Sequence, residues 1–236
     1  MPFPGGTSVS HLTVYDWSGP GDGLPGGSPH MHLACTEGYV VVGGFGRVQT
    51  LSGAGFQETP LSPLTVAWFS PGVIHRLVND DDLRIVVIMG NGGLPEAGDA
   101  VLTFPPEHLA DRETYAKAAS LAHPDKAYAS GEDGARERRN LAVRGFHRLR
   151  EQVEAGDDKA LDEFYAAGAA LVADRIPRWR EVWESGARAA AEATGEHLDA
   201  LARGDHSHLH AGRIAMEPPP SDRRFGMCGR LATYDL

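Results

Sequence analysis

Cysteines and long apolar runs are both scarce in this chain of 236 residues. Its two cysteines, Cys35 and Cys228, lie far apart and outside any C-x-x-C pattern, so the sequence predicts neither a disulfide framework nor a thiolate zinc site. No stretch approaches the ~18 to 20 consecutive apolar residues needed to span a bilayer. The first residues also lack the basic and then apolar order of a secretory signal. We therefore expect a soluble cytoplasmic protein without membrane contacts.

Basic residues are outnumbered by acidic ones. The chain has 22 Lys and Arg against 32 Asp and Glu, which gives a formal net charge of −10. Nucleic-acid surfaces depend on clustered Lys and Arg to neutralise phosphates, so this balance argues against a nucleic-acid partner. Hydrophobic residues make up 42% of the chain, enough for one sizeable core. We expect a small-molecule substrate as the main partner.

Residues 1–104 are rich in glycine and proline and contain short β-branched or aromatic runs. These runs are SHLTVYDW, EGYVVVGG, GRVQTL, LTVAWF, IHRLVN and LRIVVIMG. Short strands separated by turn residues are typical of an antiparallel sandwich or barrel. Residues 39–42 and 85–89 are apolar at successive positions, which indicates that both faces of these strands are covered. The outer face would be covered by a second copy in a homodimer or by the rest of the chain.

Residues 105–236 have a different pattern, with apolar residues at helical spacing. This spacing predicts three amphipathic helices at about 135–155, 158–173 and 175–202. Gly156 followed by Asp157 suits a helix end and a new N-cap, and Pro177 fits only the first turn of a helix. Three prolines at 218–220 predict an extended tail whose last residues add an edge strand. We expect a mainly helical extension whose tail packs on the barrel or on a dimer mate.

The stretch GGSPHMHLACTEGYVVVGGFG, residues 26–46, places chemically active side chains beside a buried strand. On a strand, His30 and His32 project to one face while Met31 points away, so the two imidazoles can converge on one ion. Four residues make a turn before Glu37 opens the next strand, and Tyr39 shares the face of Glu37 by alternation. Buried imidazole and carboxylate groups are costly unless something satisfies them, and a metal ion is one explanation.

A second stretch, FSPGVIHRLVN, has a turn at 70–72 that introduces His75 at the start of another strand. H-x-H, four residues and then Glu, a glycine seven residues later, and a downstream P-G-x-x-H-x-x-x-N together resemble the two motifs of the cupin superfamily. The resemblance covers the barrel, about residues 8–92, and nothing after about residue 110. It implies an all-β double-stranded β-helix, the RmlC-like jelly-roll barrel, followed here by an α-helical C-terminal region.

The resemblance also implies that His30, His32, Glu37 and His75 are the ligands of one divalent transition metal. The sequence departs from the family pattern at two turn positions, where Leu64 replaces a glycine and Ser70 replaces a proline. Three imidazoles and a carboxylate suit Fe, Mn, Ni, Zn or Cu, and ligand type does not choose among them. Four protein ligands in an octahedral ion leave two positions open, which is typical of a catalytic site.

These features favour a metal-dependent enzyme that acts on a small organic molecule in the barrel cavity. With Fe, the ion that we favour, the family resemblance makes a dioxygenase the first expectation, with Tyr39 able to present its hydroxyl to substrate. An isomerase, epimerase or lyase is the alternative within enzymes, and a metabolite-sensing or binding protein is the alternative outside them. The inward set has no Lys or Arg, which favours a neutral or aromatic substrate over a sugar phosphate. That set is His30, His32, Glu37, Tyr39, Val41, His75 and Leu77.

Several further residues stay open on the sequence alone. His206, His208 and His210 alternate at period two, so on an extended segment they could hold a second ion, form an exposed loop, or fold over the barrel mouth as an acid or base. Cys35 lies in the turn before Glu37, where a small turn residue is favoured over a redox role. Either Trp68 or Phe69 faces the cavity, and alternation from His75 points Arg76 away from it.

Overall fold

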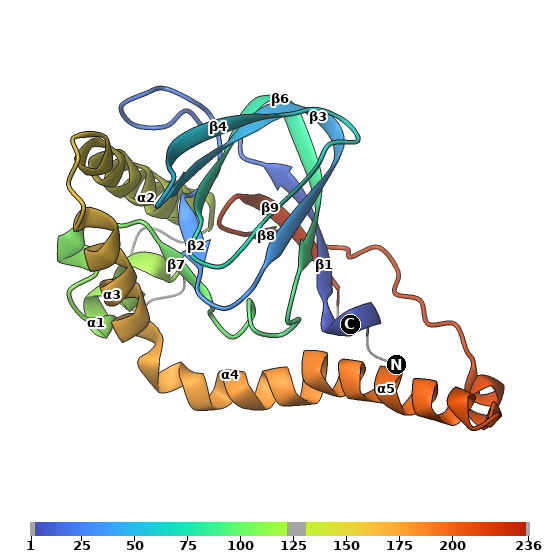
Figure 1. The fold of residues 1–236 in the computed structure, drawn as a ribbon. Helices are drawn as coiled ribbons and strands as arrows, with labels where there is room; N and C mark the ends of the chain where they lie inside the picture. The colour runs from blue at the N-terminus through green and yellow to red at the C-terminus, as the bar shows by residue number, and fades with distance from the viewer. Residues whose placement is uncertain (1–2, 122–130, 235–236) are drawn as a thin grey trace.

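Two long, bent strands organise the N-terminal half of the computed structural model, which describes residues 3–121 and 131–234 (Figure 1). Strands β3 (Glu37–Ser52) and β6 (Ile74–Met89) pair antiparallel from Glu37 to Leu51 of β3. The register shifts between Val41 and Gly46, where both strands bend. Gly44 and the facing Asp82 have positive φ at this bend, 70° and 42°, a conformation that glycine adopts without cost.

Because β3 and β6 bend, their two halves belong to two facing sheets. The first sheet adds β5 (Val66–Phe69), β1 (Ser8–Val14), β9 (Gly229–Thr233) and β8 (Arg224–Phe225) to residues 37–43 and 84–89. The second adds β4 (Gly55–Leu61), β2 (His30–His32) and β7 (Ala100–Leu102) to residues 46–52 and 74–79. This antiparallel arrangement is the predicted double-stranded β-helix, and the fold prediction is confirmed.

The barrel core follows the alternation of the strands. Along the first half of β3, buried residues alternate with more exposed ones, as a strand with one inward face requires. Tyr39, Val41, Leu77 and Ile85 are fully buried between the two sheets. Burying side chains of this size contributes about 1.5–3 kcal/mol each, so the interior of the barrel is the main source of its stability.

The C-terminal half is helical, as predicted. The helices are α1 (Arg112–Ala119), α2 (Gly131–Glu154), α3 (Ala160–Val172), α4 (Ile176–Trp183) and α5 (Ala189–Ala202), with short turns η2 (Pro106–His108), η3 (Ala173–Arg175) and η5 (Ser207–Ala211). One more short turn, η1 (Pro4–Gly6), precedes β1 in the N-terminal half. The third predicted helix is the long rod of α4 and α5, joined by a π-helical turn η4 (Glu184–Arg188). Gly156 has φ of 84° after α2, and Pro177 lies in the first turn of α4. Within the described ranges, no helix has both the length and the apolar character that crossing a bilayer requires.

Helix α1 was not predicted. It has only eight residues, too few for a clear periodic pattern, and Asp111 caps it by accepting a hydrogen bond from the Thr114 backbone N–H at 2.9 Å. Helix α3 packs on the outer side of β2: Gly168 lies against Met31, and the Tyr165 hydroxyl donates to the Gly72 carbonyl at 3.0 Å. The helical region therefore supports the strand that holds two of the candidate ligands (Figure 1).

The C-terminal tail returns to the barrel of its own chain. Strand β9 pairs with β1, with Leu231 opposite Leu12, so the predicted added strand is confirmed. Gly229 is required in this pairing, because a Cβ there would lie 2.1 Å from the Thr13 carbonyl oxygen. The tail thus extends the first sheet, although the division into domains at residue 104 stays a prediction.

One apolar outer face of the first sheet is left exposed by residues 3–121 and 131–234. Val42, Val66, Trp68 and Ile88 are 51%, 58%, 77% and 40% exposed. They project outward from β3, β5 and β6, which are neighbours in the sheet. Of the two alternatives for covering this face, the described part of the chain does not supply the cover, because the helices pack instead beside β2 and β7; cover by a second copy stays a prediction.

Leu64 has a backbone conformation that suits glycine, at the turn position where cupins have glycine. Its φ is 72° and its side chain is 87% exposed. A left-handed conformation costs a non-glycine residue about 1–2 kcal/mol. We therefore expect Leu64→Gly to raise the free energy of unfolding by about 0.5–1 kcal/mol in urea denaturation. The gain is smaller than the conformational cost that glycine removes, because glycine also increases the entropy of the unfolded state.

The matched control is Leu64→Ala, which removes most of the exposed apolar side chain but keeps Cβ. It should leave stability close to that of the wild-type protein, because the strained conformation persists. Equal stabilisation by both variants would attribute the gain to lost apolar surface and would contradict the backbone explanation.

Candidate metal centre

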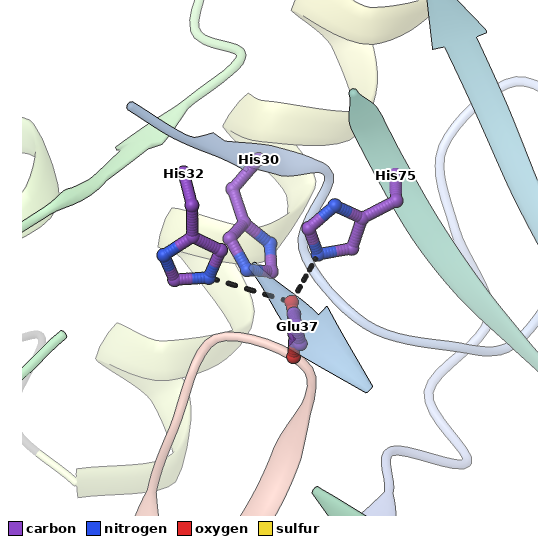
Figure 2. A group of neighbouring side chains, drawn as sticks. All are labelled: His30, His32, Glu37 and His75. Atoms are coloured by element: carbon purple, nitrogen blue, oxygen red, sulfur yellow. Dashed lines mark ion pairs between the residues drawn. The ribbon is translucent and has the colours of Figure 1, made fainter. Parts of the chain in front are cut away.

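Strand pairing brings the four predicted ligands together at one end of the barrel. His30 and His32 lie on β2, and His30 is directly opposite His75 on β6. Glu37 opens β3 after the turn that follows β2. Figure 2 shows the three imidazoles and the carboxylate pointing toward a common centre. Segments that are distant in the sequence therefore converge, because β2 pairs with the first half of β6 in the second sheet and Glu37 faces them from the first sheet.

The geometry of these four side chains is compact. One possible ligand atom from each residue lies within 4.8 Å of all the others. A Glu37 oxygen, Oε2, lies 3.1 Å from His75 Nε2 and 3.4 Å from His32 Nε2. The rings of His30 and His75 have centroids 4.2 Å apart. All four residues are buried, and His32 and Glu37 retain the most exposure, 5% and 6%.

Each imidazole is held through its outer nitrogen. Nδ1 of His30 lies 2.9 Å from the Ser28 carbonyl oxygen, and Nδ1 of His75 lies 3.1 Å from the Val73 carbonyl oxygen. Nδ1 of His32 lies 3.1 Å from the Asp99 carboxylate. These oxygens accept hydrogen bonds, so each Nδ1 carries a proton and each Nε2 is the atom that can offer a lone pair to a metal. The three lone pairs are directed toward the centre, as metal ligation requires.

Two atoms at this centre are buried without a hydrogen-bond partner. They are Glu37 Oε2 and His75 Nε2, which approach each other without hydrogen-bond geometry. A buried unpaired polar group is costly, so such groups mark a place where a partner belongs. A divalent cation fits this place, because it is bound by the same imidazole and carboxylate atoms.

The charges also suit a cation. Burial, together with the charges of His75 and His32, holds the pKa of His30 well below its usual value, so this imidazole is neutral. Burial alone would raise the pKa of Glu37, but His75 and His32 hold it well below its usual range. Burial likewise opposes a charge on His32, yet Asp99 and Glu37 raise its pKa to about 9. Without a metal, a proton on His32 compensates the negative charges of Glu37 and Asp99. A bound metal ion would replace this proton as the compensating positive charge.

Tyr39 lies in the barrel interior beside the four candidate ligands. It is fully buried, and its hydroxyl has no hydrogen-bond partner. Burial and the Glu37 charge hold its pKa well above the ordinary value, so the phenol keeps its proton. Phe69 stands between Tyr39 and His75, with ring centroids 5.3 and 4.3 Å away. Phe69 thus faces the interior, while Trp68 points outward.

Sequence reasoning missed two contributors to the centre. The first is Asp99, which holds His32 from a loop outside both motifs. The second is the turn between β8 and β9: the Ser28 N–H donates to the Met227 carbonyl at 2.9 Å, and the buried Cys228 sulfur lies 3.8 Å from His30 Nδ1. Both reach the centre through tertiary packing. The local sequence pattern around Asp99, or around the turn between β8 and β9, gives no sign of this contact.

The other residues singled out from the sequence lie away from the metal centre or have structural roles. His206, His208 and His210 are on or beside η5 at the end of α5, so the extended segment that would have put all three on one face is not formed there. His208 instead stacks on His197, with ring centroids 4.4 Å apart. In the described part of the chain, the cluster around Glu37 brings its possible ligand atoms within 4.8 Å of one another, and these three histidines form no such group.

Cys35 and Arg76 also have structural roles. Cys35 is buried, and burial together with the Asp99 charge raises its pKa, so a reactive thiolate is disfavoured. Arg76 points away from the centre, as predicted, and donates to Asp22 at 2.5 Å.

Comparisons with known proteins match only part of the chain. No family model and no curated protein matches the sequence. Among solved structures, a Streptomyces PAC13 variant with uridine is 14% identical over 36% of this chain and 58% of its own, with a TM-score of 0.28. QdtA from Thermoanaerobacterium thermosaccharolyticum, a sugar 3,4-ketoisomerase in complex with TDP, is 12% identical over 39% and 64%, with a TM-score of 0.32.

A third match is an uncharacterised Klebsiella pneumoniae protein with a double-stranded β-helix domain, 18% identical over 37% of this chain and 67% of its own, with a TM-score of 0.28. The chain thus spans less than two thirds of the length of the first structure it matches. The fold assignment depends on the chain itself: bent β3 and β6 shared by two sheets, and both motifs at one end of the barrel. Its N-terminal half is a double-stranded β-helix, joined to a helical C-terminal region.

Proposed function

We propose that this protein binds one divalent transition metal through His30, His32, Glu37 and His75 and uses it to act on a small organic molecule. The observation that supports this most strongly is a buried carboxylate and three imidazoles whose ligand atoms lie within 4.8 Å of one another. Three neutral imidazoles and one carboxylate suit Fe, Mn, Ni, Zn or Cu. We favour Fe, and the metal identity is part of the proposal.

We propose an oxygenase as the reaction class. When bound, Fe(II) supplies two coordination positions besides the four protein ligands and a redox centre for dioxygen. The chain itself supplies an apolar wall: Tyr39, Val41 and Leu77 are fully buried at inward positions. These positions hold no guanidinium or ammonium group, so a neutral or aromatic substrate suits the interior better than a phosphate dianion.

Access to the centre is narrow. His32 and Glu37 are the ligands with residual exposure, so we propose that substrate approaches from their side. His30 and His75 lie deeper in the barrel, at 2% and 0% exposure. A small molecule that reaches the centre would therefore displace little water and would be enclosed by protein on its other sides.

A second candidate is an isomerase, epimerase or lyase, which the Tyr39 hydroxyl favours. This phenol is protonated and buried, and its hydroxyl is without a hydrogen-bond partner, so it can donate a hydrogen bond to substrate without oxidation chemistry. Tyr39→Phe removes only that hydroxyl. Loss of turnover in this variant, with unchanged metal content, would assign the hydrogen-bond donor.

The two reaction classes differ in their need for dioxygen. The test loads the protein with Fe(II) under strict anaerobiosis and offers a panel of catechols, flavonols and enediols. We expect substrate-dependent oxygen uptake once air is admitted. Turnover before air is admitted would overturn the oxygenase and support the isomerase or lyase. Tight binding of a panel compound without turnover in either atmosphere would support a metabolite-binding protein.

We also propose that a second copy of the chain covers the exposed face of the first sheet. Val42, Val66, Trp68 and Ile88 form this face, and Trp68 is its most exposed member. Scattered apolar residues are ordinary on a surface, but a contiguous group on neighbouring strands is typical of an interface. Trp68→Glu is expected to convert a dimer to a monomer in analytical ultracentrifugation. A monomeric wild-type protein at tens of micromolar would contradict this proposal.

A further inference from the structure

Asp99 places a fully buried carboxylate behind the candidate metal centre. It directly precedes β7, where Ala100 pairs with His32, so the strand ladder itself puts Asp99 next to that ligand. Its side chain has no exposed surface. Asp99 Oδ2 accepts from His32 Nδ1 and from the Cys35 N–H, both at 3.1 Å.

The other Asp99 oxygen binds the turn that follows β2. Oδ1 accepts from the Leu33 N–H at 3.2 Å and from the Ala34 N–H at 2.8 Å. This turn leads from His32 to Glu37, so one carboxylate touches one candidate ligand and fixes the segment that delivers another. Four donors satisfy a buried charge that would otherwise be costly.

The partner of His32 differs in kind from those of the other two imidazoles. His30 and His75 donate from Nδ1 to neutral backbone carbonyls of Ser28 and Val73. His32 donates to a charged carboxylate. A carboxylate behind a ligating imidazole fixes its tautomer and ring orientation and makes it a stronger donor.

The charge count is consistent with a divalent ion. Glu37 and Asp99 together bring two negative charges into this buried group, and the three imidazoles are neutral when they bind through Nε2. A divalent cation would make the set neutral, whereas removal of the Asp99 charge would leave it with one net positive charge. Uncompensated charge is expensive in a buried site, so affinity for a divalent ion should depend on Asp99.

We propose that Asp99 is a positioning residue of the metal centre, which orients His32 Nε2 toward the ion and supplies the second negative charge. This rests on the proposed metal binding by His30, His32, Glu37 and His75. The proposal adds to the metal centre a residue that neither motif contains. It predicts that metal affinity depends on Asp99, which lies in the loop before β7. A solely structural role, as a cap for the turn at 33–35, would affect stability without acting through His32.

The test measures dissociation constants for Zn²⁺ and Co²⁺ by competition with a chromophoric chelator. Asp99→Asn is expected to weaken binding by about 10- to 100-fold and to change the visible spectrum of the Co²⁺ form. The matched control is Glu96→Gln in the same loop, where a carboxylate accepts from the Gly93 N–H at 2.9 Å. This control should bind metal like the wild-type protein.

A second comparison separates positioning from a structural role. In a His32→Ala background, Asp99→Asn should cause a clearly smaller further loss of affinity than in the wild-type protein, because the part of its effect that passes through His32 is already lost. An equal loss in both backgrounds would overturn the proposal, as would unchanged affinity in Asp99→Asn. Absence of metal binding by the wild-type protein would overturn the proposed function as well.

Should Asp99→Asn fail to fold, the zinc-loaded wild-type protein provides an independent measurement. Of the three ligating imidazoles, His32 is expected to show the Nδ1 proton furthest downfield by NMR, because its hydrogen bond to Asp99 is charge-assisted. A His32 Nδ1 proton no further downfield than those of His30 and His75 would overturn the proposal.

Discussion

His75→Ala is expected to weaken Zn²⁺ binding by about 100-fold or more. Apparent binding free energies of about 10–16 kcal/mol for four-ligand zinc sites give about 3 kcal/mol per ligand, and about 1.4 kcal/mol is a factor of ten. His75 is fully buried and lies opposite His30, so no neighbouring group can replace its Nε2 from solvent. The measurement is a competition titration of the metal-free protein with a zinc chelator.

The controls separate ligation from folding. His11 is an exposed histidine on β1 of the same barrel, and His11→Ala should leave the zinc affinity unchanged. His75→Gln fills more of the space that alanine would leave empty, so it tests whether a cavity causes the loss. Zinc affinity within about threefold of wild type in folded His75→Ala would remove His75 from the ligand set.

Asp22→Asn is expected to lower the free energy of unfolding by about 3 kcal/mol. Removal of one partner from a buried ion pair leaves the other charge uncompensated, which costs about 3–5 kcal/mol, and the partial exposure of Asp22 places the effect at the lower end. Arg76 is fully buried, and its guanidinium donates to Asp22 at 2.5 and 3.4 Å. Urea denaturation of both proteins measures the difference.

This ion pair also has a definite pH dependence. Burial alone would raise the pKa of Asp22, but the hydrogen bond and charge of Arg76 lower it below 3.8. A lowered folded-state pKa means that the stabilisation is complete above the unfolded-state value and is lost as the pH falls through the folded-state value. The stability difference between wild type and Asp22→Asn should therefore persist at pH 7 and shrink below about pH 4.

The matched control for Asp22 is Asp80→Asn. Asp80 pairs with Arg47 at 2.6 Å, but both side chains are partly exposed, at 40% and 25%. An exposed pair contributes about 0–1 kcal/mol, so this variant should lose little stability. Equal losses in the two variants would contradict the importance of burial at Arg76.

The candidate site was predictable where local geometry determines it. His30 and His32 share a face because strand side chains alternate, and Glu37 follows after a short turn. Gly44 and Leu64 likewise occupy the turn conformations that the motif implies, with φ of 70° and 72°. The sequence predicted separate strands before and after Gly44, and likewise before and after Asp81. In the structure each pair is one continuous bent strand, β3 or β6, because a bulge and a residue with positive φ let the pairing continue through the bend.

The rest of the site depends on contacts that no local pattern encodes. Asp99 reaches His32 only because β7 pairs with β2, and Cys228 reaches His30 only because the tail pairs with β1. Register decided between Phe69 and Trp68, since Glu37 lies opposite Phe69 and Gly38 opposite Trp68. A five-residue 3₁₀ helix at Ser207–Ala211, rather than an extended segment, contains His208 and His210, so the histidines do not alternate along a strand.

The most direct test is X-ray absorption, combined with elemental analysis, on untagged wild-type protein loaded with Zn²⁺. The result that we expect is one zinc per chain in a shell of nitrogen and oxygen at about 2.0–2.2 Å, with the scattering pattern of three imidazoles. A sulfur shell near 2.3 Å, a shell without imidazole, or substoichiometric zinc at saturating concentration would contradict ligation by His30, His32, Glu37 and His75.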